Sequence, residues 1–221
     1  MCGRFSLSKP SSISSFFTGL TLPEELRARY NIAPSSQVLI VLNDGQIRFD
    51  LARWGLIPSW ASDPQIGNSL INARAETLAE KPSFRQAFKK RRCLIPVDGF
   101  FEWTKGPGSK TRTPIHIRMK TGEPFAFAGL WEQWRSPDGE SIRSCTIVTT
   151  TPNDLLSAFH HRMPVIVSPE NYERWLDPRL DSSEVQDILV PYPPERMAAY
   201  KVSTLVNDPK NDLFECIQPA V

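Results

Sequence analysis

The sequence has no long apolar run, no marked excess of charge of either sign and very few histidines. Its 221 residues carry 26 Lys and Arg against 24 Asp and Glu, which gives a formal net charge of +2. No apolar segment approaches the ~20 residues that a membrane-spanning helix needs. So small a net charge also argues against a uniformly basic coat for nucleic acid. The remaining composition, 40% hydrophobic and 23% charged, is typical of a globular protein.

Cysteine and histidine spacing gives no sign of a metal site. The four cysteines form no Cys-x-x-Cys pair, and the three histidines show no zinc-binding spacing. Cys93 and Cys145 lie in apolar runs, where a free cysteine behaves as a small hydrophobic residue. No signal peptide precedes them. We therefore expect a reduced, cytoplasmic protein with no metal, no cofactor and no membrane association.

Arginine supplies most of the positive charge, with 17 Arg against 9 Lys. Arginine is the better residue for bidentate phosphate contacts and for stacking, although the same bias also occurs as a plain surface preference. The basic run from Lys89 to Arg92 has two readings as well: it could follow phosphates or be a solvated face.

Apolar periodicity and turn signals predict a fold rich in antiparallel strands. Asn43-Asp44-Gly45 and Asp138-Gly139 are tight-turn signals, and each is flanked by strand-like segments. Residues 114–120 alternate apolar and polar side chains, the period of a half-buried strand. The expected strands cover residues 38–42, 46–53, 92–97, 100–103, 114–120, 125–134 and 141–150.

The expected helices are short and peripheral. Ser11 is a candidate N-cap, and Pro169 suits the first helical position. The loop 105–110 is predicted to be a hairpin turn. We therefore predict an α+β fold: a single β-rich domain over residues 1–221, with antiparallel barrel-like sheets, short peripheral helices and a monomeric state. The expected helices cover residues 11–17, 83–90, 153–159, 169–175 and 181–189.

The start of the chain, Met1-Cys2-Gly3-Arg4, carries a candidate nucleophile. Because Cys2 is small, we expect Met1 to be removed, leaving an α-amine and a thiol on adjacent carbons. Such a pair condenses with an aldehyde to a Schiff base and closes to a thiazolidine, helped by a high effective molarity. An α-amine with a pKa of ~7.7–8.0 is far more often unprotonated at neutral pH than a lysine at ~10.4. The plain alternative is that Cys2 is only a small second residue.

Two further positions suit this chemistry, each with a structural alternative. Asn72 and Arg74 are two residues apart, so on an extended segment they share a face. They could hold a reacting group and a phosphate, or form an amide contact and an ion pair at a strand end. Glu102 lies between Phe101 and Trp103, where desolvation would raise its pKa into an acid–base range. The same alternation also fits Glu102 facing water, with both aromatic residues in the core.

The remaining candidate functional residues are a pair of histidines and two residues in segments rich in turns. His160 and His161 precede Arg162, and one of them could move a proton near neutral pH or belong to a polar loop before a strand. Trp60 and Pro34 lie in segments rich in aromatic residues and turns. Such side chains stack on bases or wedge between them, and core packing is the alternative.

In their order along the chain, these blocks resemble the SRAP (SOS-response-associated peptidase) family. The resemblance runs from Cys2 to about Gln218 and therefore covers nearly the whole sequence. It implies a β-barrel-like fold with a positively charged groove for single-stranded DNA that contains abasic sites. The blocks that carry it are residues 1–5, 29–34, 54–60, 71–76, 93–103 and 160–164.

The resemblance also implies roles for individual residues. Cys2 matches the crosslinking nucleophile, and Asn72 matches an asparagine beside the crosslink. Glu102 matches the acid that assists Schiff-base chemistry, and His160 matches the catalytic histidine. The expected DNA contacts are Arg4, Arg74, Arg162, Trp60 and Pro34.

Together these features predict an abasic-site sensor that shields such sites by a covalent link during replication-coupled repair. We expect abasic-site lyase activity, self-reversal of the link and limited autopeptidase activity to accompany this role. We also expect the protein to be associated with the nucleoid. One alternative is an N-terminal-nucleophile amidohydrolase, because one class of glutamine amidotransferases also opens with Cys-Gly; it would require a layered α/β/β/α fold. A non-catalytic single-strand binding module is the other.

Overall fold

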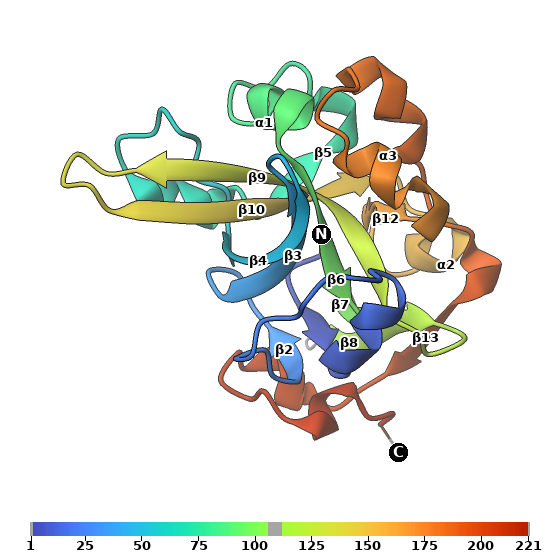
Figure 1. The fold of residues 1–221 in the computed structure, drawn as a ribbon. Coiled ribbons are helices and arrows are strands. Elements are labelled where there is room, and N and C mark those ends of the chain that lie inside the picture. Colours follow the sequence, from blue (N-terminus) through green and yellow to red (C-terminus); the bar gives the residue numbers. More distant parts are fainter. Residues whose placement is uncertain (1, 106–111, 221) are drawn as a thin grey trace.

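A computed structural model describes residues 2–105 and 112–220 (Figure 1). Strands dominate these ranges and the helices are short, so the predicted β-rich α+β fold is confirmed. The hairpin turn expected at 105–110 lies outside the described residues except for Lys105, and so does Met1 with its expected removal. Within the described ranges, no helix is long and apolar enough to cross a membrane.

Five strands of the described chain close into a ring, which confirms the barrel-like prediction. In order, β10 pairs with β4, β4 with β3, β3 with β6, β6 with β9, and β9 again with β10. Only the β4–β10 pairing in this ring is parallel. The two turns predicted from Asp-Gly signals join β3 to β4 and β9 to β10. The ring strands are β3 (Gln37–Asn43), β4 (Ile47–Trp54), β6 (Arg92–Val97), β9 (Phe125–Arg135) and β10 (Ser141–Thr150).

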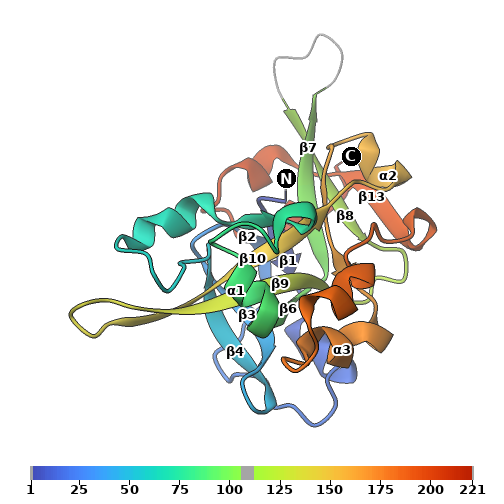
Figure 2. The ribbon, with the colours of Figure 1, turned by 90° about the horizontal axis from the view of Figure 1, so that it is seen from above.

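Strand β10 continues beyond the ring and gathers two more strands at its end. Its residues 147–149 pair in parallel with β5 (Asn72–Arg74), and residues 149–150 pair with β11 (Met163–Pro164). A further short strand, β12 (Ile166–Val167), pairs with β9. At its other end the β9–β10 hairpin projects from the body of the molecule in both ribbon views (Figure 2).

A second sheet of the described chain has the order β13–β8–β7–β1–β2, and all of its pairings are antiparallel. Strand β1 lies inside it, between β7 and β2. The sequence pattern did not predict β1, β2 or β13, which are three to five residues long and pair with partners distant in the chain. The strands are β1 (Phe5–Leu7), β2 (Arg29–Ile32), β7 (Gly99–Lys105), β8 (Arg112–Met119) and β13 (Met197–Lys201).

The helices lie at the edges and include many 3₁₀ turns. The segment expected at 11–17 is a 3₁₀ turn whose N-cap is Lys9, so the N-cap assigned to Ser11 was wrong. Pro169 does open a helical segment, and Asn153 caps α2 through the amide of Leu156. The α-helices are α1 (Arg85–Lys90), α2 (Asp154–Ser157) and α3 (Tyr172–Leu176). The 3₁₀ turns are Pro10–Ser15, Pro64–Ser69, Ala75–Thr77, Pro169–Asn171, Ser182–Ile188, Pro194–Arg196, Thr204–Asn207 and Phe214–Ile217.

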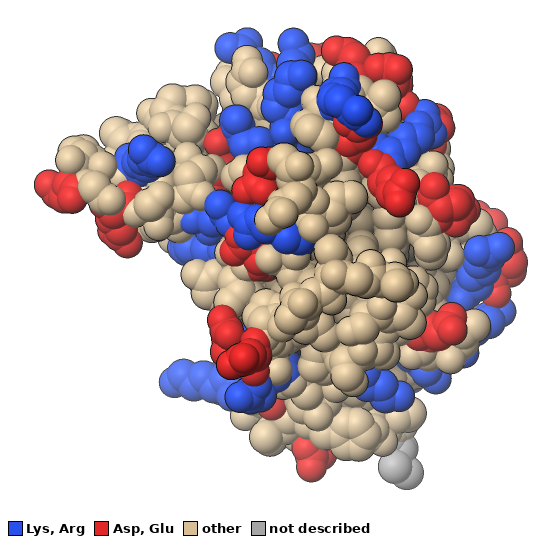
Figure 3. Space-filling view, in the orientation of Figure 1, with Lys and Arg blue, Asp and Glu red and all other residues tan. Residues whose placement is uncertain are grey.

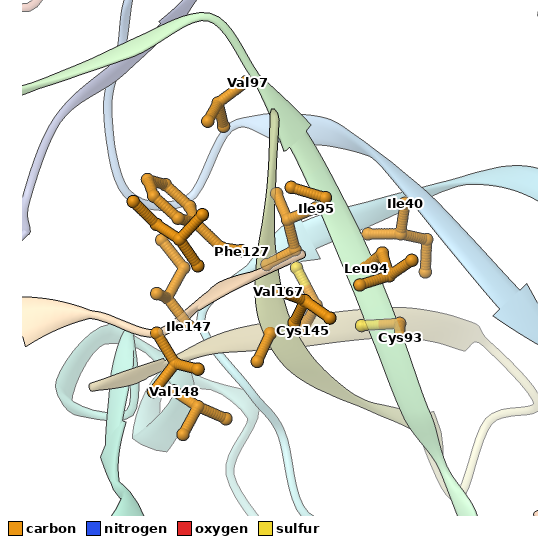
Figure 4. Packing of buried hydrophobic residues seen from close by; sticks show 14 of the residues in the cluster. Ile40, Cys93, Leu94, Ile95, Val97, Phe127, Cys145, Ile147, Val148 and Val167 are labelled. Atoms are coloured by element: carbon orange, nitrogen blue, oxygen red, sulfur yellow. The ribbon is translucent and has the colours of Figure 1, made fainter. Parts of the chain in front are cut away.

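The barrel interior is apolar and includes two of the cysteines (Figure 4). Cys93 on β6 and Cys145 on β10 are fully buried beside Leu94, Ile95 and Phe127. Burial raises the pKa of both thiols. The two residues are therefore packing residues, as their apolar surroundings in the sequence predict.

Candidate functional site

Cys2 lies three residues before β1 and is fully buried. Its carbonyl oxygen accepts a hydrogen bond of 2.9 Å from Nδ2 of Asn72, and its thiol donates to the carbonyl of Arg4 at 3.7 Å. That same carbonyl also accepts from the amide of Phe101 at 3.0 Å, which extends the β1–β7 ladder toward the N-terminus. The backbone around Cys2 is therefore fixed by contacts to two other segments.

Glu102 reaches this position from the neighbouring strand β7. Phe5 pairs with Phe100, and continuing this antiparallel register places Glu102 opposite the residue next to Cys2. The Glu102 side chain is only 4% exposed, and its burial raises its pKa to about 7. Burial, and then the charge of Glu102, raise the pKa of the Cys2 thiol. The alternative in which Glu102 faces water was wrong.

Asn72 brings an acceptor as well as a donor to the site. Its Nδ2 holds the Cys2 carbonyl, while its Oδ1 is buried and has no hydrogen-bond partner among the described residues. A buried acceptor without a partner costs roughly 1–3 kcal/mol, which a ligand donor would recover. Asn72 is held by its parallel pairing to Ile147 of β10.

His160 comes from the other side of β10, in the turn that leads from α2 to β11. Its Nδ1 accepts a hydrogen bond of 3.0 Å from the backbone amide of Arg162. Its ring stacks on His161 with the centroids 4.3 Å apart. Partial burial lowers the pKa of His160, so the ring is neutral near pH 7. The end of β10 thus separates the segment that carries Asn72 from the segment that carries His160.

Comparison with known proteins fits this arrangement. The sequence profile of the SOS response associated peptidase (SRAP) family matches residues 1–209. The chain belongs to the SRAP family. Abasic site processing protein YoqW of Bacillus subtilis is 48% identical, over 99% of each chain. Abasic site processing protein HMCES of Rattus norvegicus is 30% identical, over 90% of this chain and 67% of its own length. A crystal structure from Bacteroides thetaiotaomicron matches with a TM-score of 0.89 and 28% identity, over the whole of both chains.

Arg4 of this SRAP chain lines an open pocket that the sequence analysis did not find. The guanidinium donates to Oδ1 of Asn31 at 2.7 Å and to the carbonyl of Val206 at 2.9 Å, and it lies 5.8 Å from the centre of the Trp103 ring. Asn31 is itself buried and donates to the carbonyl of Asn211 at 2.7 Å. The segment around residues 204–211 therefore fixes the Arg4 side chain, directly through Val206 and indirectly through Asn31. The pocket, about 660 Å³, is lined by Gly3, Arg4, Trp103, Arg112, Thr204 and Asn207.

The two other arginines expected to contact DNA are placed very differently in this SRAP fold. Arg74 is exposed at the end of β5. Arg162 is buried, and its guanidinium donates to both oxygens of Glu76 at 2.7 and 2.9 Å and to the carbonyl of Thr149 at 2.5 Å. Arg74 is thus available to a phosphate, whereas the guanidinium of Arg162 is engaged within the protein.

Pro34 and Trp60 lie in two segments of the SRAP chain that are bonded to each other. Trp60 is 60% exposed in the loop after β4, and Pro34 is half-buried just before Ser35. Ser35 donates to Oδ1 of Asn68 at 3.1 Å, and Arg53 donates to the same oxygen at 2.7 Å. Ser35 has a φ of 69°, a strained value for a residue with a side chain. These bonds hold the Pro34 turn against the loop that carries Trp60.

On the face of the molecule shown in Figure 3, charge is mixed rather than gathered by sign. In Figure 3, basic and acidic side chains lie side by side around the rim of the view, and the broad central area carries few of either. Within residues 2–105 and 112–220, no group of three or more His, Cys, Asp or Glu is placed to hold a metal ion.

Proposed function

We propose that this SRAP protein binds abasic sites in single-stranded DNA and links to them covalently through Cys2. The observation that carries the proposal is the position of Cys2, whose backbone is held by Asn72 and which lies beside a carboxyl group with a pKa of about 7. The names of the relatives support the substrate, since two of them are abasic site processing proteins. The single-strand preference, the monomeric state and the covalent chemistry are our inference.

The proposed reaction begins once Met1 has been removed. The α-amine of Cys2 adds to C1′ of the open abasic sugar, and the carbinolamine loses its hydroxyl as water to give a Schiff base. The Cys2 thiol then adds to C1′, its proton passes to the nitrogen, and a thiazolidine ring results. Glu102, close to half protonated at neutral pH, is suited to protonate the leaving hydroxyl.

Asn72 and His160 would act on the sugar. The Oδ1 atom of Asn72 is a buried acceptor that a sugar hydroxyl or the Cys2 nitrogen can satisfy. His160 is neutral near pH 7 and contributes when the sugar ring opens and when the link reverses. The Schiff-base stage would also permit strand cleavage by β-elimination. Lyase activity, self-reversal and limited autopeptidase activity are therefore part of the proposal.

DNA binding would rest on a few cations and exposed rings rather than on a basic coat. Arg74 is exposed beside Asn72, and Arg4 lines the pocket next to Cys2. Trp60 and Pro34 are candidates for stacking or wedging, and Trp60 has the exposure that stacking needs. An abasic sugar has no base to extrude, so it can reach Cys2 without the full cost of base flipping.

The fold speaks against the amidohydrolase alternative. That class needs two sheets covered by layers of helices, whereas the described helices are short and lie at the edges of a barrel. A buried carboxyl group with a raised pKa beside the N-terminal cysteine is typical of a catalytic site, and a purely non-catalytic binding module would not require one.

Intact mass spectrometry of the full chain tests the proposal. The protein is measured before and after mixing with an abasic single-stranded oligonucleotide, with the same oligonucleotide carrying an intact base as control. We expect loss of Met1 and a heat-stable adduct, formed only with the abasic strand, whose mass is the sum of both components minus one water. Absence of this adduct in protein that lacks Met1 would refute the proposal.

A further inference from the structure

The outer half of the β9–β10 hairpin extends past the strands of the barrel. The pairing of β9 with β6 reaches Leu130, and the pairing of β10 with β4 reaches Ser144. Residues 132–135 and 141–143 lie beyond these pairings and pair with each other. Both ribbon views show this part of the hairpin projecting from the body of the molecule (Figures 1 and 2). Its apolar side chains therefore need a partner outside the barrel.

One face of this extension carries a small apolar cluster of its own. Trp134 pairs with Ile142, so both side chains lie on the same face of the hairpin. They pack against Ile57, Ala61 and Ile66, which come from the segment between β4 and β5. Trp134, Ile57 and Ala61 are buried, and the cluster is separate from the barrel core. We call these five residues the platform.

Hydrogen bonds fix the β4–β5 segment on the platform. The indole Nε1 of Trp134 donates to the carbonyl of Ala61 at 2.7 Å. The amide of Ile57 donates to Oγ of Ser144 on β10 at 2.8 Å. Trp60 lies between these two points, directly before Ala61, and is 60% exposed. The backbone on both sides of Trp60 is thus held while its ring faces solvent.

We propose that Trp134 is a positioning residue for Trp60, and that the projecting hairpin serves to hold the Trp60 ring ready to stack on a base beside the abasic site. This inference rests on the function proposed above. Stacking on an aromatic ring contributes to the binding of any sequence, because every base has a π face. A ring that is already held in its binding position avoids the ordering cost that a free loop would have.

The second attachment of this segment is more exposed. Oδ1 of Asn68 accepts hydrogen bonds from Ser35 and Arg53, and both bonds lie at the solvent-exposed surface. Water can replace such bonds at little cost, whereas the carbonyl of Ala61 is buried with its donor. Trp134 is therefore the main support of the segment.

The opposite face of the extension provides a matched control. Gln133 donates to Oγ of Ser141 at 2.8 Å and accepts from Nε of Arg143 at 3.2 Å. These contacts stay within the hairpin. The substitution Gln133→Ala therefore alters the hairpin next to Trp134 but leaves the platform intact.

Binding to a single-stranded oligonucleotide with a tetrahydrofuran abasic analogue, which has no aldehyde and cannot crosslink, tests the proposal. Trp60→Ala should raise the dissociation constant about tenfold, the loss of roughly one stacked base. Trp134→Ala should raise it by a similar factor. The double variant should bind no more weakly than Trp60→Ala, because Trp134 acts through that ring. Gln133→Ala should bind like the wild type. Fluorescence anisotropy measures all five proteins.

Two further measurements separate positioning from general damage to the fold. In single-turnover crosslinking with protein that lacks Met1, Trp134→Ala should need more abasic DNA for half-saturation but keep its maximal rate within about twofold. Amide hydrogen exchange without DNA should become faster at residues 57–66 in Trp134→Ala and stay unchanged in β3 and β6. A loss of stability alone would not confine the change to this segment.

The proposal is overturned by a Trp134→Ala protein that binds like the wild type, by effects of Trp134→Ala and Trp60→Ala that multiply, or by a lower maximal crosslinking rate. If Trp134→Ala does not fold, Trp134→Phe decides. It keeps an aromatic ring but removes the donor to Ala61, and it should weaken binding about threefold, only when Trp60 is present. A wild type that binds the analogue as expected but forms no adduct with the abasic strand would refute the proposed function and leave the positioning role standing.

Discussion

At the scale of single residues, the proposed chemistry gives Cys2 two nucleophiles, the α-amine left by removal of Met1 and the thiol, whose contributions can be separated. Cys2→Ala in protein that lacks Met1 keeps the α-amine, so it should form a borohydride-trappable Schiff base and nick the strand, with no stable adduct. Cys2→Ser should behave similarly, since a hydroxyl is a far weaker nucleophile than a thiol near neutral pH. Protein that retains Met1 should form neither product at Cys2. The three forms are compared on one abasic oligonucleotide by denaturing gel, and a full-yield adduct from the Met1-retaining form would assign the chemistry to another residue.

Glu102 should have a separate effect on the pH dependence of the crosslinking rate. With a pKa of about 7, its protonated fraction falls as the pH rises through 7, and only the protonated form is a general acid. The ratio of the wild-type crosslinking rate to the Glu102→Gln rate should therefore drop above about pH 7. Taking the ratio cancels the ionisation of the α-amine, which both proteins share. The ratio is obtained from single-turnover rates measured between pH 6 and 9. A ratio that rises with pH would show that Glu102 acts as a general base and not as a general acid.

The same shift predicts a stability effect with a defined sign. The folded-state pKa of Glu102 is raised from 4.5 to about 7, so the folded protein favours the protonated carboxyl. Wild type should lose stability relative to Glu102→Gln as the pH rises from about 4.5 to about 7, with no further change above that. At ~1.4 kcal/mol for each pKa unit, the difference is at most about 3–4 kcal/mol in the free energy of unfolding. Urea unfolding at pH 5 and pH 8 measures this readout without DNA.

At the scale of elements, Gly99 of β7 leaves room for the side chain of His116, which comes from the neighbouring strand β8. Ser6 pairs with Gly99, and a Cβ atom there would lie 2.2 Å from Nε2 of His116. His116 cannot easily move, because it is hydrogen-bonded to Ser6 at 3.2 Å and to Tyr200 at 2.9 Å. Gly99→Ala should therefore lower the free energy of unfolding by about 1–3 kcal/mol. Urea titration measures it, and in a His116→Ala background the same substitution should cost much less. Equal costs in both backgrounds would place the strain elsewhere.

How much of the fold could be predicted depended on the length of each strand and the distance to its partner. β3, β4, β9 and β10 are long and joined by Asp-Gly turns, so the local sequence suffices to predict them. β1, β2, β5 and β13 are three to five residues long and become strands through partners far along the chain. No window of sequence shows such pairings.

The predictions for single residues also depended on whether the local sequence carries the information or only the three-dimensional arrangement does. The alternation of Phe101, Glu102 and Trp103 suggested one buried and one wet face, yet both faces of β7 are covered there. Phe101 packs with Val206 and other residues of the C-terminal segment, while Glu102 is buried beside Cys2. Motif order supplied the candidates around Cys2, but the bonding of Arg162 to Glu76 could only come from the three-dimensional arrangement.

At the scale of the whole molecule, a net charge of +2 limits how DNA is held. Binding should be independent of sequence and use few phosphate contacts, of which Arg74 is one. Arg74→Ala should weaken single-stranded DNA binding and reduce the slope of log K against log salt by about one phosphate contact. Fluorescence anisotropy at several salt concentrations provides both quantities, with Arg179→Ala as an exposed control. An affinity that does not change with salt would exclude this mode of binding.

Strand β1, finally, sets the mechanical behaviour of a crosslinked complex. Under the proposed chemistry, any pull on the DNA, for instance by a motor moving along it, enters the protein at Cys2 and passes into β1 three residues later. That strand is hydrogen-bonded to β7 on one side and to β2 on the other, and beyond it Ser8 is tied to Asp98 by its hydroxyl at 2.7 Å. A pulling force therefore acts on the hydrogen bonds to β7 and to β2 at the same time, whereas a strand at the edge of a sheet would be held by one row of hydrogen bonds only. The link should hold under tension, and a protease that unfolds its substrate from the DNA-bound end would meet its greatest resistance at the first strand.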